Sequence, residues 1–413
     1  MNTTRISLVT FLCLGALMQA LPTARGAAAA EKHAPMVKMD DAKLNDWPTR
    51  WQRNIIGDAR NRYCDKDMGE DIAWHMTPFM DGFYYGYLAT GDPKWAVMLM
   101  DWTDSWAKRA VKEPDGFLGW PSPAAAGTKV DNLDDFNADS MLSDAMVLRA
   151  VVLMAGEIRK TPALQAKYAA KADGYLKFAE SVYEKWEQRG GWRETKDGGS
   201  ISVVLPFGID GQSGKWTAGY ATRNAPGNGF SHPDNKANLV ARWLLAMSDA
   251  TSKPVYKERA ERWFKLMKSR MKLKADGTYE IWNYWQPAGP WDYKPDGATK
   301  HWVGVHPNPG YYQIDVAAIV DAYEHGLVFS REDIDRLIAT ALAEKRYWDA
   351  LVPYSAEIQA KFEQNMKPDS WGGLSATPHY LMLQARLRQG GRTASAVDRA
   401  ASYNTYRRPS DAQ

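Results

Sequence analysis

The stretch Trp282–Tyr312 holds the chain's densest group of residues suited to binding chemistry: four Trp, four Tyr and two His, set among Gly and Pro. Linkers are poor in aromatic residues, and Pro and Gly interrupt helices, so this stretch is neither a linker nor a long helix. Flat rings with a polar handle suit stacking on sugars, whose C–H faces are apolar and whose rims carry hydroxyls. The stretch therefore predicts a carbohydrate-binding cleft. Its candidate substrate-binding side chains are Trp282, Tyr284, Trp285, Trp291, His301 and Trp302.

A second group of polar residues, His232–Asn238, lies at the start of a predicted helix. His232 precedes the helix and can act as a base. Asn235 and Asn238 are three residues apart and therefore share one helical face. Their amides can bind a substrate, and we expect the amide of Asn238 to hydrogen-bond a carboxylate and help neutralise it. The structural alternative is that Asp234 or Asn235 only caps the helix. Capping uses neither His232 nor Asn238, so we favour a functional role for His232.

Arg223 belongs to the segment TRNAPGNGF, which leads into this group. An Arg fork suits bidentate recognition of a carboxylate, such as that of a uronic acid. The alternative is a surface loop, because Asn, Pro and Gly are turn-forming residues. We count Arg223 among the candidate catalytic residues.

The segment HPNPGYYQID places a Pro- and Gly-rich turn before another predicted helix. It brings His306, Tyr311 and Tyr312 to the start of that helix as candidate catalytic residues. A tyrosine can serve as the acid, but its usual pKa is about 10. A base role would therefore need cations nearby. The alternative is an aromatic lid over the core, and we expect one of the two tyrosines only to pack.

Acidic residues offer a different chemistry, since glycoside hydrolases use two carboxylates across the sugar. Capping and solvation explain acids near helix starts equally well. The candidate hydrolase acids are Asp134, Asp135, Asp139, Glu70 and Asp71.

Several functional classes are disfavoured by the sequence. The formal net charge is only +3, which gives no global basic field for nucleic acid. There is no HExxH pattern or cysteine cluster for a metal. There is also no Gly-rich nucleotide fingerprint, so we expect no metal and no cofactor.

The N-terminus reads as a secretory leader. Arg5 supplies a charged start, Ile6–Ala20 is apolar, and small residues follow up to Ala30. We expect residues 1–30 to be a cleaved signal peptide and the protein to be secreted or periplasmic, without stable membrane insertion. The polar tail 392–413 has little periodicity, and we expect it to be disordered.

Between these ends, helical patterns come in pairs joined by short turns. The expected pairs are 70–89 with 94–111, 137–159 with 162–186, 235–249 with 255–271, and 311–325 with 331–347, followed by a final helix at 371–388. An early helix at 46–56 is also expected. First helices are small and aromatic, while second helices are more charged, which predicts an inner and an outer layer. Only Ser200–Leu205 alternates like a strand, and we assign it to a loop hairpin.

Hairpins such as DGFYYGYLATGDPKW and NLVARWLLAMSDATSKPVYKERAERWFKLMKSRM resemble the helix pairs of (α/α)-toroid carbohydrate-active enzymes. That group includes polysaccharide lyases, uronyl hydrolases and glucuronyl C5-epimerases. The resemblance implies an all-α fold, an (α/α) toroid of five or six hairpins over residues 31–391. It implies a saccharide substrate more than a particular reaction. The long connections between pairs are then expected on one rim, where they would build the cleft.

The leading hypothesis is a lyase that cleaves a uronate glycan by β-elimination. Arg223 and Asn238 would neutralise the carboxylate, His232 or His306 would remove the C5 proton, and Tyr311 or Tyr312 would protonate the leaving oxygen. A glycoside hydrolase that uses a carboxylate pair, a uronyl C5-epimerase and a non-catalytic glycan-binding protein remain alternatives. The sequence leaves the oligomeric state open.

Overall fold

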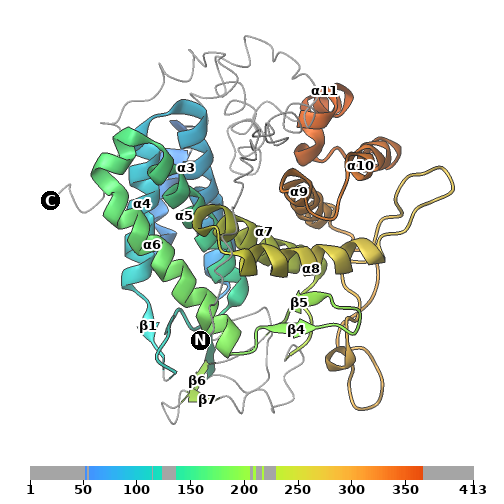
Figure 1. Cartoon of the computed structure of the whole chain (residues 1–413), viewed down its shortest axis with the longest axis horizontal. Coiled ribbons are helices and arrows are strands. Elements are labelled where there is room, and N and C mark those ends of the chain that lie inside the picture. The colour runs from blue at the N-terminus through green and yellow to red at the C-terminus, as the bar shows by residue number, and fades with distance from the viewer. Residues whose placement is uncertain are drawn as a thin grey trace, which may run out of the picture.

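The computed structural model describes residues 52–53, 55–113, 115–122, 136–204, 208–210, 216–217 and 229–365. Four helical hairpins dominate this part of the chain (Figure 1). They are α3 (Thr77–Thr90) with α4 (Pro93–Lys108), α5 (Met141–Lys160) with α6 (Pro162–Gln188), α7 (Asp234–Thr251) with α8 (Pro254–Arg270), and α9 (Gly310–Glu324) with α10 (Arg331–Ala343). The helix α11 (Ala356–Asn365) follows. Short 3-10 helices lie at Ala59–Asn61, Tyr63–Asp65, Pro290–Asp292 and Asp349–Tyr354.

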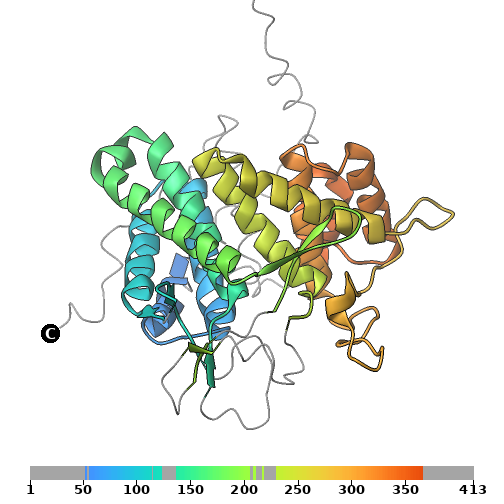
Figure 2. The ribbon, with the colours of Figure 1, turned by 60° about the horizontal axis from the view of Figure 1, so that its bottom comes forward.

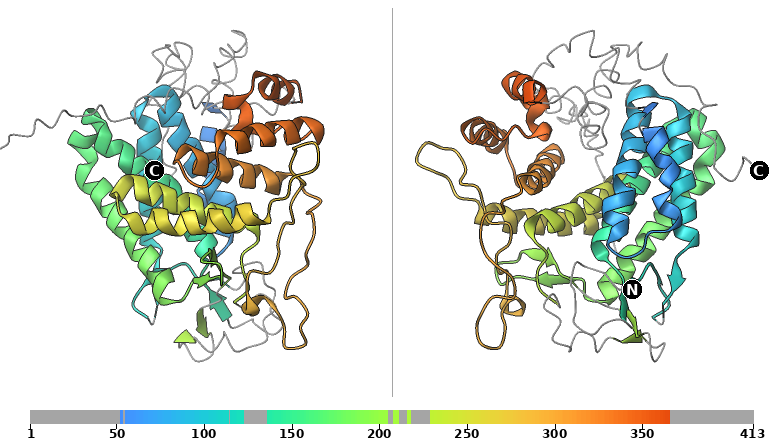
Figure 3. Two further views of the ribbon diagram at one scale, coloured as in Figure 1. Left: turned by 45° about the vertical axis from the view of Figure 1, so that its right-hand side comes forward. Right: turned by 180° about the vertical axis from the view of Figure 1, so that it is seen from behind.

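The hairpins are arranged in two layers. Helices α3, α5, α7 and α9 pack against one another in succession, and α4, α6, α8 and α10 lie outside them. Seen from several sides, the hairpins follow one another around an arc (Figures 2 and 3). The all-α class and the (α/α)-toroid architecture predicted from the sequence are confirmed. The predicted helix 371–388 lies outside the described residues, as do the predicted leader 1–30 and tail 392–413.

The strands are short and belong to the connections. They are β1 (Val111–Lys112), β2 (Leu118–Gly119), β3 (Phe136–Ala138), β4 (Trp192–Glu194), β5 (Ser200–Ser202), β6 (Gly208–Asp210) and β7 (Trp216–Thr217). β1 pairs with β2, β4 with β5, and β6 with both β3 and β7, all antiparallel. The expected loop hairpin at Ser200–Leu205 is thus confirmed as the β4–β5 hairpin.

Helix starts follow local capping chemistry. The side chain of Asp92 accepts a hydrogen bond from the Lys94 backbone N–H, and Pro93 occupies the first turn of α4. Ser330 and Asp333 form a reciprocal capping box at α10. Both starts match the sequence-based expectation.

One predicted helix start was wrong, and another predicted helix differs in type at its start. The helix expected from Glu70 begins at Asp71, but its first turn is a π-helical segment, Ile72–Met76, before α3 begins at Thr77. Pro78 has no backbone N–H, so it cannot donate the hydrogen bond to the Trp74 carbonyl that an α-helix beginning earlier would contain. The helix expected from Asn137 begins only at Met141, because the backbone there forms β3 and Ser140 then caps α5.

No helix among the described residues is long and apolar enough to cross a membrane.

Candidate active site

The N-terminal ends of the inner helices meet on one rim. Ala73 of the π-helical segment, Leu142 of α5 and Leu239 of α7 form a buried apolar cluster. Met146 and Ile314, from α5 and α9, pack against it. This cluster joins the inner layer just below the helix starts. Polar residues at those starts therefore lie around a shared apolar floor.

His232 lies at the α7 rim, directly before the helix. An isolated bridge between Val203 and Ser231 aligns this segment with the end of β5. The backbone N–H of His232 donates to the Ser202 carbonyl at 2.9 Å, and its ring Nδ1 lies 2.9 Å from Ser202 Oγ. Burial, and then the charge of Lys236, lower the pKa of His232 to about 3. Its imidazole is therefore neutral at physiological pH.

The other two rim histidines are held differently. Nδ1 of His306 accepts a hydrogen bond from the Asn308 backbone N–H at 2.9 Å, and Nδ1 of His301 accepts one from the Trp302 N–H at 2.7 Å. A neutral imidazole whose Nδ1 accepts must carry its hydrogen on Nε2. His301 and His306 therefore present a donor at Nε2. Only His232, among these three, has a hydroxyl partner that fits either tautomer.

The two rim asparagines differ in the same way. Asn238 is fully buried: its amide donates to Asp315 Oδ1 at 2.7 Å and accepts from Trp263 Nε1–H at 2.8 Å. The amide of Asn235 is also buried, at 1% exposure, yet neither its nitrogen nor its oxygen has a hydrogen-bond partner among the described residues. The expected role of Asn238 in binding a substrate carboxylate is therefore corrected, because its amide already has partners. Asn235 is the asparagine whose amide has no protein partner in the described part of the chain.

Lys236 is a rim residue that the sequence analysis missed. Its Nζ donates to Glu70 Oε1 at 2.7 Å, which links α7 to the start of the π-helical segment. Its charge also lowers the pKa of both His232 and His301, after the larger effect of burial. A lysine in the first turn of a helix opposes the helix dipole. That conflict was the available signal in the sequence.

Two buried carboxyls beneath the rim were also missed. Burial raises the pKa of Asp234 to about 6. Burial, and then the charge of Asp234, raise the pKa of Asp315 to about 8. Asp315 accepts from Asn238 and, at 3.0 Å, from Trp282 Nε1–H. An acid amid the apolar residues of GYYQIDVAAIV was the signal for it.

Aromatic rings form the wall of the rim. The ring of Tyr284 stacks on Trp302 with centroids 5.6 Å apart and on Tyr311 at 5.3 Å. The ring centroid of His306 lies 4.4 Å from that of Tyr311 and 4.8 Å from that of Tyr284. His301 joins them 6.0 Å from Tyr284. Trp302 remains 44% exposed, so part of the wall faces solvent.

The two tyrosines of the rim have different environments. Tyr311 is partly exposed and lies in the ring wall. Tyr312 is fully buried: its hydroxyl accepts from the His306 backbone N–H at 2.8 Å and donates to the Trp282 carbonyl at 3.0 Å. The hydroxyl of Tyr312 thus ties the aromatic loop to α9. Of the two expected candidates, the geometry leaves Tyr311 available for chemistry.

Three of the tryptophans expected to stack on sugars lie largely inside the loop. Trp285 has no exposed surface, and Trp282 is 6% exposed. Trp291 is half-buried and donates from Nε1 to Ser231 Oγ at 2.9 Å. The expected stacking role is corrected for Trp282 and Trp285, whose faces are covered by protein. They instead form the structural backing of the ring wall.

Among the candidate hydrolase acids, Asp139 lies within a buried ion-pair cluster at the α5 rim. Its Oδ2 lies 2.5 Å from Lys185 Nζ and 3.3 Å from Arg189 Nη1. Burial raises its pKa, but the charges of Lys185 and Arg189 outweigh burial and hold that pKa below its usual range. The expectation that Asp139 serves as a hydrolase acid is corrected, since its carboxylate is enclosed by these cations.

Two of the other candidate acids, Glu70 and Asp71, lie in the described part of the chain. Glu70 is buried, and its Oε2 has no hydrogen-bond partner among the described residues, whereas Asp71 is exposed. Asp134, Asp135 and Arg223 lie outside the described residues. Within the described part of the chain, no group of three or more His, Cys, Asp or Glu side chains is placed to hold a metal ion.

Comparison with solved structures finds similar helical architectures. One is a glycoside hydrolase family 76 mannosidase from Bacteroides thetaiotaomicron, at 14% identity and a TM-score of 0.48, covering 84% of this chain and 100% of that one. Another is the unsaturated glucuronyl hydrolase of Bacillus sp. GL1, responsible for glycosaminoglycan degradation, at 15% identity and a TM-score of 0.43, covering 90% of this chain and 95% of that one. No family model matches the chain, and no curated protein matches it. Identities this low leave function to be argued from the residues of the site.

Proposed function

We propose that this protein is a polysaccharide lyase that cleaves a uronic-acid-containing glycan by β-elimination at the α7 rim. One observation carries the proposal. At that rim a neutral, buried histidine, His232, lies three residues before a buried asparagine, Asn235, whose amide has no hydrogen-bond partner among the described residues. A neutral base and a carboxylate-binding amide are two groups that the elimination requires.

Neutralisation of the substrate carboxylate is the first requirement. The unpaired amide of Asn235 can donate to it, and Lys236, which is paired with Glu70, lies in the same first turn of α7. The first turn of α7 contributes the positive end of an 18-residue helix dipole. Together these groups stabilise the negative charge that develops on the carboxylate when the C5 proton leaves. Arg223, which lies outside the described residues, remains a candidate for the same task.

Proton transfer is the second requirement. His232 Nε2 takes the proton from C5, the C4–C5 double bond forms, and the bond from C4 to the leaving oxygen breaks. The hydroxyl of Tyr311 donates its proton to that oxygen. The ring centroid of His306 lies 4.4 Å from that of Tyr311. Burial raises the pKa of the neighbouring Tyr284, so the hydroxyl of Tyr284 stays protonated. These steps balance without a cofactor.

Sugar binding is assigned to the ring wall. Trp302 offers an exposed face, and Tyr284 and Tyr311 extend the stack behind it. Such rings bind the apolar faces of sugars and keep the polymer aligned across the rim. We also propose that the protein is secreted or periplasmic, on the support of the leader pattern at 1–30.

An ultraviolet absorbance scan of the reaction tests the proposal. Purified protein is mixed separately with alginate, pectate, glucuronan and glycosaminoglycans. Elimination creates a C4–C5 double bond conjugated with the carboxylate, which absorbs ultraviolet light. A rise on one polymer is the expected result and also identifies the substrate class. New reducing ends without absorbance would contradict elimination.

A glycoside hydrolase is the second candidate, and two observations favour it. Glu70 has a buried carboxylate oxygen without a hydrogen-bond partner among the described residues. The pKa of Asp234 is raised to about 6 by burial, as the acid of a glycosidase requires. Reducing ends that disappear in a Glu70→Gln variant, with no absorbing product from the wild type, would favour this reading.

A further inference from the structure

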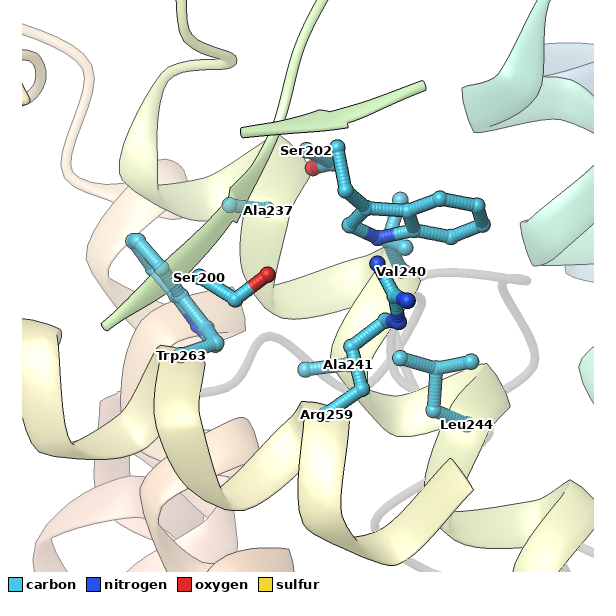
Figure 4. Close-up of a pocket in the computed structure, with 9 residues that line it drawn as sticks. Ser200, Ser202, Ala237, Val240, Ala241, Leu244, Arg259 and Trp263 are labelled. Atoms are coloured by element: carbon cyan, nitrogen blue, oxygen red, sulfur yellow. The ribbon is translucent and has the colours of Figure 1, made fainter. Parts of the chain in front are cut away.

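A small hollow lies beside Ser202, whose hydroxyl contacts the His232 ring. Its walls come from the β4–β5 hairpin, α7 and α8, as Figure 4 shows. The polar lining residues are Ser200, Ser202 and Arg259. Its volume of about 10 Å³ is room for about one water molecule. Ser202, the residue that contacts the His232 ring, thus has the hollow beside it.

Two groups that line the hollow are buried and lack a hydrogen-bond partner among the described residues. They are Ser200 Oγ and Arg259 Nε. The rest of Arg259 is fixed, because its Nη2 donates to Glu187 at 2.9 Å and its guanidinium lies over the Trp192 ring at 4.6 Å. An unmade hydrogen bond in a buried site costs about 1–3 kcal/mol. One water in this hollow would remove that cost for both groups.

The hydrogen-bond capacity of Ser202 links the hollow to the histidine. A hydroxyl has one hydrogen to donate and two lone pairs to accept. If Ser202 donates that hydrogen to Nδ1, the neutral ring carries its hydrogen on Nε2 and cannot act there as a base. If Ser202 instead donates into the hollow, its oxygen accepts from Nδ1–H, and Nε2 keeps a free lone pair.

We propose that the hollow binds one water molecule and that Ser202 is a positioning residue, which this water orients so that His232 keeps its hydrogen on Nδ1. The water accepts from Ser202 O–H and from Arg259 Nε–H and donates to Ser200 Oγ. It makes three hydrogen bonds, the usual number for buried water. The purpose of the arrangement rests on the proposed function, since a base needs the free lone pair at Nε2. The tautomer itself is a property of the protein alone.

The test is a two-dimensional ¹H–¹⁵N correlation spectrum of the histidine side chains in the purified, ¹⁵N-labelled protein near neutral pH. The chain has seven histidines, and the His232 signals are those that a His232→Gln variant lacks. We expect the wild type to show the hydrogen on Nδ1. We expect Ser202→Ala to shift His232 to the other tautomer or to a mixture, and Ser202→Thr, which keeps the hydroxyl, to restore the wild-type pattern.

Two outcomes would overturn the inference: a wild-type His232 with its hydrogen on Nε2, or an unchanged tautomer in Ser202→Ala. If Ser202→Ala does not fold, Ser200→Ala takes its place, because it removes one partner of the water and should also shift the tautomer population. An unchanged population in that variant would equally contradict the role of the water.

A kinetic measurement then separates the inference from the proposed function. On a polymer that the wild type eliminates, Ser202→Ala should lower kcat by about 10- to 100-fold with KM nearly unchanged, and Ser202→Thr should recover it. A protein with the Nδ1–H tautomer but no eliminase activity would sink the proposed function and leave the tautomer inference standing. Eliminase activity with an Nε2–H tautomer would do the reverse.

Discussion

The N-terminal ends of α5 and α7 lie in successive hairpins on the same rim, but their polar groups have opposite surroundings. At α5, Lys185 lies 2.5 Å from Asp139 and 2.7 Å from Asp144, and Arg189 pairs with Glu113 and Asp115. At α7, the amide of Asn235 has no partner among the described residues.

This difference distinguishes buried polar groups that stabilise the fold from those that we assign to the site. The α5 cluster pairs its charges with one another, and these pairs hold the β1–β2 connection and α6 to the helix start, although Glu113 Oε1 and Asp144 Oδ1 are buried without a hydrogen-bond partner among the described residues. The α7 rim keeps a neutral histidine and an unpaired amide beside an aromatic wall, a state that costs stability unless a ligand completes it. A buried amide with neither of its two polar atoms bonded within the described part of the chain distinguishes the α7 rim from the ion-paired α5 rim.

The largest expected effect comes from removing the hydroxyl of Tyr311. Tyr311→Phe should lower kcat by about 10²- to 10⁴-fold, because a positioned acid contributes that much to proton transfer. Tyr293→Phe, in the exposed part of the same loop, is the matched control and should keep wild-type kinetics. Initial rates from product absorbance measure both. Equal rates in the two variants would remove Tyr311 from the chemistry.

The α5 cluster should respond in stability. Lys185→Met leaves Asp139 and Asp144 buried without their shared cation, which should cost about 3–5 kcal/mol in the free energy of unfolding. Lys265→Met, which breaks an exposed pair with Glu261, should cost only about 0.3–0.5 kcal/mol. Urea titrations followed by circular dichroism give both values. Similar small losses would show that the α5 cluster is no tighter than a surface pair.

Replacing each of the two rim asparagines should have a different effect, one on stability and the other on substrate binding. Asn238→Ala leaves Asp315 Oδ1 and Trp263 Nε1–H without a partner and should cost about 1–3 kcal/mol in unfolding free energy. Asn235→Ala removes groups that have no protein partner, so it should leave the free energy of unfolding near the wild-type value while weakening substrate binding. Unfolding titrations and KM values measured side by side check the pair. A large stability loss in Asn235→Ala would contradict the comparison.

Two histidines predict opposite pH effects on stability. Because the pKa of His232 is lowered in the folded protein, the unfolded chain takes up a proton at this histidine at a higher pH than the folded protein does. The contribution of His232 to the free energy of unfolding therefore falls as the pH drops from about 6.5 towards about 3. Burial lowers the pKa of His325, but Asp249, which bonds to Nε2 at 2.9 Å, outweighs burial and leaves that pKa raised. The stability from His325 is full below its unfolded pKa and is lost as pH rises through its folded pKa. Because Asp249 and part of His325 are exposed, this effect is the smaller one.

Unfolding titrations across pH separate these contributions. His232→Gln should flatten the acid side of the stability profile, and His325→Gln should flatten the side above about pH 6.5. A profile unchanged in both variants would contradict the two pKa directions.

Local signals in the sequence predicted much of the fold. Asp92 with Pro93, and Ser330 with an acid three residues on, mark helix starts whose chemistry depends only on neighbours in the chain. The start of α5 was wrong because β3 pairs with β6 about 70 residues away, a partner that no local pattern shows.

His232, Asn235 and Tyr311 are candidates because their residue types suit the chemistry, and their role stays a prediction. Asn235 and Asn238 look alike in sequence. Only the long-range contacts of Asn238 with Asp315 and Trp263 separate them. In the same way, Trp285 is fully buried and donates to the Ser231 carbonyl, whereas Trp302 in the same loop stays exposed.

The most direct test of the central claim compares the wild type with His232→Gln on a uronate polymer, recording product absorbance and reducing ends together. His75→Gln, an exposed histidine bonded to Asp67, is the matched control. The account predicts that both signals rise together for the wild type and for His75→Gln, and that neither rises for a folded His232→Gln. Undiminished absorbance from His232→Gln, or reducing ends without absorbance from the wild type, would contradict it.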